Sequence, residues 1–324
     1  MENKVTIIGY TGSGKTTYLT GMYMCMSGVG CKNYTIGAIN PNQDVDLERL
    51  WDSLYAGKFP AASNNSETYS FHIAHCYKPV CDFDWLDYPG GLLSDPSNPQ
   101  WQNMKKSIET ADCLLFVLDG AKFQIEASDE NEYREKLIHK LTYDKGIRNE
   151  IKEFNSLSQK SIKKIPPVCL LITKCDLINL DYKSAIESAL TEVLSGLFAS
   201  TPLAIITSVS LGENIIEDGP NPFCIEEPIA FAVLNILLKY MDELKDEKKR
   251  ASGVIDKDRG FISRWWDKEE IESAQQILRD LTAMGNKWIE DAYKLLDLFD
   301  SEKDVYVHGK KQKFHGCFRN LFQG

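Results

Sequence analysis

A glycine-rich segment close to the start of the chain has the residue types and spacing that bind polyphosphates. It reads Gly9-Tyr10-Thr11-Gly12-Ser13-Gly14-Lys15-Thr16. Glycines permit backbone angles that turn several N–H groups towards one point, and the N-terminus of a following helix adds the positive end of its dipole. The segment lies between the apolar run 5–9 and a helical pattern over 15–27, which is the context this motif requires. We therefore expect a nucleoside triphosphate site, with a chance glycine-rich turn as the alternative.

Two side chains of this segment would act on the phosphates directly. Lys15 would reach the β- and γ-phosphates, and the Thr16 hydroxyl would coordinate Mg²⁺. The residues expected to surround the phosphates are Gly9, Thr11, Gly12, Ser13, Gly14, Lys15, Thr16 and Thr17. Kinases, ATPases and GTPases all bind triphosphates in this way, so the segment does not identify the base.

A second candidate segment ends an apolar strand pattern with a carboxylate. It reads Trp85-Leu86-Asp87-Tyr88-Pro89-Gly90-Gly91. Asp87 would hold Mg²⁺ through a water molecule, and the Gly90 amide would bond to the γ-phosphate. Loss of that phosphate would then release the loop, as in a nucleotide-dependent switch. An Asp-x-x-Gly sequence is also a common turn, so a purely structural role stays open at this point.

Two later segments predict recognition of guanine. They are Thr173-Lys174-Cys175-Asp176, after the apolar run 168–172, and Thr207-Ser208-Val209-Ser210, at the end of the run 203–207. The Asp176 carboxylate would accept hydrogen bonds from the N1–H and 2-amino groups of guanine, and adenine has neither donor. Lys174 would pack along the base plane beside Thr173, and a backbone amide at Ser208 or Val209 would donate to the guanine O6 atom. A helix cap at Asp176 is the structural alternative.

The elements that must position these residues follow from the order of the apolar runs. Short apolar runs alternate with helical patterns, which predicts an α/β fold with a doubly wound, mostly parallel sheet. The candidate segments lie at the ends of predicted strands, where such sheets bind ligands. We expect a nucleotide-binding domain over 1–245 with a helix-rich insert at about 128–164, and a C-terminal helical extension over 246–324.

Two features are expected within the C-terminal extension. Residues 269–299 have helical periodicity interrupted by a glycine, which predicts two helices broken near Gly285. Residues 304–315 alternate around Gly309, which predicts a terminal hairpin.

The composition restricts the possible partners and location. A formal net charge of −10 disfavours a nucleic-acid partner, because affinity for a phosphate backbone comes largely from Lys and Arg. No apolar stretch approaches the roughly 20 residues of a transmembrane helix. The chain starts without a signal-peptide pattern, and its 9 cysteines have no regular spacing. We therefore expect a cytoplasmic protein with reduced thiols and no transmembrane segment.

Taken together, these segments resemble those of the TRAFAC class of P-loop GTPases, the translation-factor-like class that includes Ras and its relatives. The resemblance covers residues 1 to about 245 and lies in the order of the phosphate loop, Asp-x-x-Gly, Thr-Lys-x-Asp and Ser-x-Ser segments. Thr173 stands where Asn is commoner. More narrowly, the chain resembles the double-GTPase families proposed for prokaryotic conflict (defence) systems, through segments 9–20, 56–60 and 87–91.

The resemblance implies a Mg²⁺-dependent hydrolase that binds GTP and GDP and acts as a switch. In a conflict system it would sense or regulate a protein effector or respond to an activator, and oligomerisation is one route to activation. The alternatives are a scaffold that binds GTP without hydrolysing it and, with less support from the motifs, a P-loop ATPase.

Two positions leave the expected pattern incomplete. Ras-like enzymes often have a Gln after the Asp-x-x-Gly glycine, and this chain has Gly91 there. We expect slow hydrolysis unless another residue, a second copy or a partner supplies the missing group. The pattern also requires a Ser or Thr before Asp87 as a Mg²⁺ ligand. Ser63 or Thr68 is the first choice and Thr35 the alternative.

Overall fold

The computed structural model describes residues 2–28, 30–60, 65–95, 97–157, 164–213, 215–258 and 268–323. Within them, one nine-stranded sheet has the order β2-β3-β4-β1-β5-β6-β7-β8-β9. The strands are β1 (Lys4–Gly9), β2 (Tyr34–Ala38), β3 (Glu67–His75), β4 (Lys78–Asp87), β5 (Cys113–Asp119), β6 (Val168–Thr173), β7 (Leu203–Ser208), β8 (Asp304–Val307) and β9 (Lys310–Lys313). The central strands β4-β1-β5-β6-β7 are parallel, and both edges are antiparallel. This confirms the predicted mostly parallel sheet.

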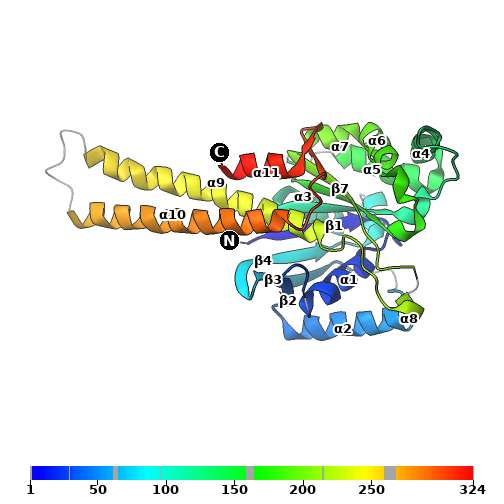
Figure 1. Ribbon diagram of the computed structural model, residues 1–324, viewed down its shortest axis with the longest axis horizontal. Coiled ribbons are helices and arrows are strands. Elements are labelled where there is room, and N and C mark those ends of the chain that lie inside the picture. Colours follow the sequence, from blue (N-terminus) through cyan, green and yellow to red (C-terminus); the bar gives the residue numbers. More distant parts are fainter. Residues whose placement is uncertain are drawn as a thin grey trace.

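Helices cover both faces of the sheet, so the fold is doubly wound (Figure 1). They are α1 (Lys15–Ser27), α2 (Pro41–Tyr55), α3 (Gln100–Thr110), α4 (Glu130–Tyr143), α5 (Lys145–Leu157), α6 (Lys183–Val193), α7 (Ser195–Ser200), α8 (Ile215–Asp218), α9 (Glu227–Asp258), α10 (Lys268–Leu296) and α11 (Phe314–Gln323). Short 3-10 turns are η1 (Gly90–Ser94), η2 (Gly120–Phe123), η3 (Cys175–Leu177) and η4 (Leu180–Tyr182). The expected helix-rich insert contains α4 and α5.

Two apolar cores lie on opposite faces of the sheet. One lies against α1, α9, α10 and α11, and the other against α3 to α7. Val5 and Ile7 of β1 are buried in the first core and Ile8 in the second. This alternation follows from the two-residue period of a strand, and burial on both faces explains why the central strands are continuous apolar runs.

The helices α9 and α10 form a long arm. Figure 1 shows α10 running back beside α9, with both helices projecting from the body of the molecule. The first part of α9, from Ile229 to Leu237, is buried in the first core. The predicted break near Gly285 is wrong, because α10 is one continuous helix. A Cβ at Gly285 would lie 3.5 Å from both Cδ atoms of Leu244, so this glycine lies at the contact between the two helices.

The C-terminal residues extend the sheet. Strands β8 and β9 form the expected hairpin, with positive φ angles at His308 and Gly309 in its turn. β8 pairs with β7, and a buried ion pair joins Lys303 to Glu227 at the start of α9, with 2.5 Å between Nζ and Oε2. The division of the chain at residue 245 stays a prediction, since α9 runs through that position. In the described part of the chain, no helix has the length and apolar character needed to cross a membrane.

Candidate functional site

The glycine-rich segment forms a loop between β1 and α1. Gly12 and Gly14 have φ angles of 81° and 88°, which favour glycine. Gly14 is the N-cap residue of α1 and has no side chain that could accept a hydrogen bond from the first N–H groups of the helix. The first N–H groups of α1 have no partner within the helix, so the loop offers donors to an anion at the positive end of the helix dipole.

Lys15 is the buried cation of this loop. Its side chain is 8% exposed, and Nζ donates to the carbonyl oxygens of Gly9 at 2.9 Å and Tyr10 at 3.4 Å. Burial lowers the pKa of Lys15, and the nearby carboxylate of Asp87 opposes this effect. A phosphate at the loop would add negative charge beside the buried ammonium group and so favour its protonated form.

Asp87 ends β4 next to the loop and is 7% exposed. Its Oδ1 atom is buried and has no hydrogen-bond partner among the described residues. Burial raises the pKa of Asp87 to about 6, while Lys15 and a hydrogen bond from Thr16 lower it. A buried carboxylate oxygen without a partner, beside a Thr hydroxyl, fits a hydrated Mg²⁺ ion, because oxygen ligands and retained waters suit that ion.

Gly90 begins η1 in direct contact with the phosphate loop. A Cβ at Gly90 would lie 2.2 Å from the backbone nitrogen of Thr11 and 2.5 Å from the backbone carbon of Tyr10. Only glycine permits this approach of two backbones. At Gly91 a Cβ would meet no described atom within 4 Å. Leu92 and Leu93 follow and are buried in the second core.

Thr173 and Lys174 connect the end of β6 to the phosphate loop. The buried Thr173 hydroxyl lies 2.7 Å from the Ser13 carbonyl oxygen and 3.2 Å from that of Leu118. Lys174 has a φ angle of 52°, and its Nζ donates to the Gly12 carbonyl oxygen at 3.2 Å. The same Nζ lies 2.9 Å from Oδ1 of Asp119. The segment predicted to select the base is therefore fixed to the segment predicted to bind phosphate.

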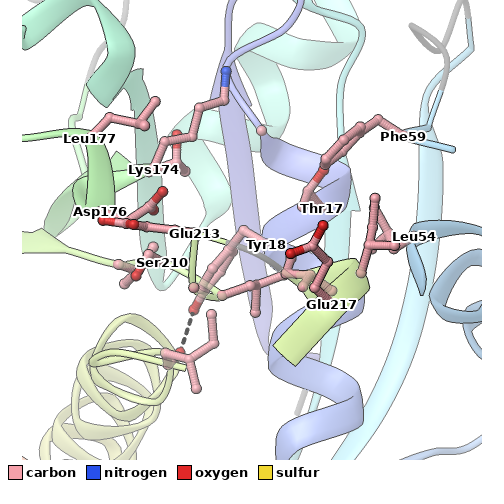
Figure 2. Close-up of a pocket in the computed structure, with 18 residues that line it drawn as sticks. Thr17, Tyr18, Leu54, Phe59, Lys174, Asp176, Leu177, Ser210, Glu213 and Glu217 are labelled. Atoms are coloured by element: carbon pink, nitrogen blue, oxygen red, sulfur yellow. Dashed lines mark hydrogen bonds between the residues drawn. The ribbon is translucent and has the colours of Figure 1, made fainter. Parts of the chain in front are cut away.

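Two adjoining cavities lie along these segments. The first, which we call the phosphate cavity, has a volume of about 440 Å³. The second, which we call the base cavity, has a volume of about 470 Å³ (Figure 2). Both are lined by Gly14, Thr17, Phe59 and Lys174, so they meet at these residues. A ligand with an anionic end and a ring-shaped end would span the two.

Most of the predicted site residues line one of the cavities. The phosphate cavity is lined by Thr11, Gly12, Gly14, Lys15, Thr16, Thr17, Asp87, Gly90 and Lys174. Thr173, Lys174, Asp176 and Val209 line the base cavity. Gly9 and Ser13 are not among the described lining residues of either cavity, although both bond to residues of the site through their carbonyl oxygens.

Other predicted residues lie elsewhere or have other bonds. Ser208 is on β7 and is not among the described residues that line either cavity. The Val209 N–H donates to the Ile172 carbonyl oxygen at 2.8 Å, a bond it would have to give up to reach a ligand. Thr68 is on β3 and lines a separate hollow against α2, and Thr35 is on β2. Ser63 lies outside the described residues.

Three residues of the site were given no role by the sequence analysis, although Phe59 lies in the segment 56–60 that carries part of the resemblance. Phe59 is 68% exposed and lines both cavities, and Figure 2 shows it across the base cavity from Lys174. Asp119 ends β5 and pairs with Lys174, while Glu217 of α8 lines the base cavity. The position of Asp119 at the end of an apolar run was a usable signal, as it was for Asp87. Phe59 and Glu217 belong to connections whose spatial position the sequence does not give.

No known protein family and no curated protein matches this sequence. Among solved structures, the chain is similar to the S. cerevisiae Ski7 GTPase-like domain bound to GTP, with 16% identity and a TM-score of 0.37. That match covers 67% of this chain and 45% of the Ski7 chain. A second likeness is to the signal recognition particle receptor SRb-GTP/SRX complex from Chaetomium thermophilum, with 16% identity and a TM-score of 0.35, over 66% of this chain and 93% of that chain.

Proposed function

We propose that this protein is a guanine-nucleotide-binding switch that hydrolyses GTP to GDP and phosphate in a Mg²⁺-dependent reaction. One observation carries the proposal. The two cavities meet at Gly14, Thr17, Phe59 and Lys174, so a single nucleotide can place its phosphates at the loop and its base at Asp176.

The phosphate cavity supports stabilisation of charge on a triphosphate. Lys15 and the N–H groups at the start of α1 would face the β- and γ-phosphates and offset the charge that develops during transfer. Thr16 and Asp87 would hold Mg²⁺, the latter through water, and the ion would neutralise phosphate charge when bound. The Oδ1 atom of Asp87 supports this assignment, because it is buried and has no hydrogen-bond partner in the described part of the chain.

The base cavity supports selection of guanine. Asp176 would accept hydrogen bonds from N1–H and the 2-amino group, whereas adenine would leave the carboxylate unpaired, which is costly. Lys174 and Phe59 lie on opposite sides of this cavity and would cover the two faces of the nucleoside (Figure 2). The Val209 N–H would have to release its hydrogen bond to the Ile172 carbonyl oxygen before it could donate to O6.

Gly90 supports a switch rather than a static site. Its backbone lies against Thr11 of the phosphate loop, so a γ-phosphate at the loop would meet the start of η1. Loss of that phosphate would remove the contact and free η1 to move, which is how order–disorder switches respond to hydrolysis.

Binding without hydrolysis is the second candidate function, and Gly91 favours it. No side chain at this position can orient a water molecule, and a Cβ there would meet no described atom within 4 Å. Gly91→Gln should therefore fold normally and raise single-turnover phosphate release by about tenfold or more if a water-orienting group is all that is missing. Absence of release from both proteins would favour the non-hydrolysing scaffold.

We further propose a biological setting for the switch. A protein effector or activator, a cytoplasmic location and a role in a prokaryotic conflict system come from resemblance of the sequence segments alone. The projecting α9–α10 arm offers surface for such a partner (Figure 1).

Equilibrium binding of fluorescent GTP, GDP and ATP analogues with Mg²⁺ tests the proposed function. We expect the wild type to prefer guanine nucleotides and Asp176→Ala to lose that preference, with affinity for GTP falling by at least about 100-fold. Tighter binding of ATP than of GTP would instead favour the P-loop ATPase.

A further inference from the structure

The base cavity carries an excess of negative charge that recognition of a base does not explain. Among the described residues that line it, three are carboxylates (Asp176, Glu213 and Glu217) and one is a cation (Lys174). Lys174 is already paired, because its Nζ lies 2.9 Å from Oδ1 of Asp119. Guanine needs one carboxylate at its N1 and 2-amino edge, so Glu213 and Glu217 are not needed to recognise the base.

Glu217 lines the base cavity on the side of Thr17, one of the residues at which the two cavities meet (Figure 2). The ribose of a nucleotide connects phosphate to base, so it would lie where the two cavities meet, at Thr17 and Phe59. Figure 2 shows Glu217 on the same side of the base cavity as Thr17 and Leu54, with Asp176 on the opposite side. The helix that carries Glu217, α8, packs against α2, the helix that ends beside Leu54.

We propose that the Glu217 carboxylate faces the ribose, accepts hydrogen bonds from its free hydroxyls, and rejects guanine nucleotides that carry phosphate on the 2′ or 3′ oxygen. This inference depends on the proposed function, because it requires a guanine nucleotide in the site. It adds the class of nucleotide that the site admits: 5′-phosphorylated guanosines with an unmodified ribose.

Guanine nucleotides with a free ribose and those with a 2′- or 3′-phosphate differ most in their chemistry at this position. A ribose hydroxyl donates a hydrogen bond to a carboxylate, an interaction that acidic residues make with ribose in other nucleotide sites. A phosphate group at the same place has no donor when ionised and brings a charge of about −1.5 to −2. The phosphate cavity contains Lys15 and the helix N-terminus for the 5′-phosphates, whereas the base cavity offers no unpaired cation among its described lining residues.

Binding of GDP and of guanosine 5′-diphosphate 3′-diphosphate to the wild type and to Glu217→Gln tests the inference. The substitution removes the charge and keeps the shape. We expect the wild type to bind the 3′-phosphorylated nucleotide at least about tenfold more weakly than GDP, and Glu217→Gln to lose most of that difference. Because Glu217 is exposed, the discrimination by the wild type should also shrink as ionic strength rises.

Asp218→Asn is the matched control, since Asp218 is the next residue of the same short helix and is not among the described residues lining either cavity. It should discriminate as the wild type does. Equal binding of both nucleotides by the wild type, or unchanged discrimination in Glu217→Gln, would overturn the inference while leaving GDP binding intact. Failure of the wild type to bind GDP at all would instead overturn the proposed function.

Discussion

At the scale of single residues, the buried hydroxyl of Thr173 connects the glycine-rich loop to the segment from Thr173 to Asp176. It lies 2.7 Å from the Ser13 carbonyl oxygen and 3.2 Å from that of Leu118. The hydroxyl has one hydrogen, which it can share between these two carbonyl groups. The side chain thus fixes the loop to β5 and β6, a role that its place in the sequence did not reveal.

Thr173→Val should weaken GTP binding by about tenfold and destabilise the fold by about 1–3 kcal/mol, because a buried carbonyl group loses its donor. Thr201→Val is the control. Its hydroxyl is also fully buried and bonds to the carbonyl oxygens of Pro166 and Leu203, away from both cavities. Urea unfolding should show similar losses of stability in the two variants. Nucleotide titration should show weaker GTP binding by Thr173→Val only. Equal GTP affinity in both would contradict the role of Thr173.

Gly90 and Gly91 provide a second matched pair. Gly90→Ala would force a methyl group against the backbone of Thr11, so we expect the free energy of unfolding to fall by about 1–3 kcal/mol. Relative to the wild type, the affinity of this variant for GTP should fall more than its affinity for GDP. The methyl group of Gly91→Ala would meet no described atom within 4 Å, so this variant should behave as the wild type. Thermal unfolding and titration with both nucleotides measure the effects. If Gly90→Ala binds both nucleotides as the wild type does, the contact between Gly90 and Thr11 is not a γ-phosphate sensor.

The motif residues that line the two cavities could be picked out from the sequence because their spacing is local. The phosphate loop and the segment from Thr173 to Asp176 each need only a few consecutive residues after a strand. Phe59 and Glu217 reach the cavity from separate connections, so only the tertiary structure brings them to Asp176. The sequence also could not show that the Val209 amide is already bonded, since its hydrogen bond to Ile172 depends on the pairing of β6 with β7.

At the scale of elements, the arm shows where local signals mislead. A glycine inside a helical pattern costs stability, and this led to the incorrect expectation of a break at Gly285. The helix continues because Gly285 lies against Leu244 of α9, a contact that sequence periodicity does not contain.

Gly285→Ala should stabilise the protein by about 0.5–1 kcal/mol, since alanine favours the helix and its Cβ would lie at an ordinary contact distance of 3.5 Å from Leu244. Gly316→Ala in α11 is the control for propensity alone, because a Cβ there would meet no described atom within 4 Å. Urea unfolding of both variants gives the comparison. Destabilisation by Gly285→Ala alone would mean that the two helices require closer contact than this distance implies.

At the scale of the whole molecule, residues far apart in sequence complete one sheet. The alternation of strands and helices was predictable, because apolar periodicity is a local property. Pairing of β8 with β7 was not, since strand partners are non-local. The buried pair of Lys303 and Glu227 spans 76 residues, and Thr207 also donates to the same Glu227 oxygen. This cluster joins the C-terminal hairpin to α9 and to the strand that ends at the base cavity.

Lys303→Met should cost about 3–5 kcal/mol, because it leaves the Glu227 carboxylate buried without its cation. Adding Glu227→Gln should recover part of that loss. Lys313→Met removes an exposed lysine that pairs with Glu302 at 2.9 Å and with Asp304 at 3.5 Å, and it should change stability by less than about 1 kcal/mol. Equilibrium unfolding of the three variants measures these changes in stability. A small effect of Lys303→Met would show that the C-terminal hairpin contributes little to the stability of the sheet.

Selection of guanine by Asp176 is the central claim, and Asp176→Asn tests it most directly. An asparagine can donate to the 2-oxo group of xanthine and still accept from N1–H, so the variant should bind XTP more tightly than the wild type does. Its affinity for GTP should fall by at least about 100-fold. Asp181→Asn, an exposed substitution nearby in η4, should leave both affinities unchanged. If Asp176→Asn keeps its affinity for GTP and gains none for XTP, Asp176 does not read the base and the proposed function is wrong.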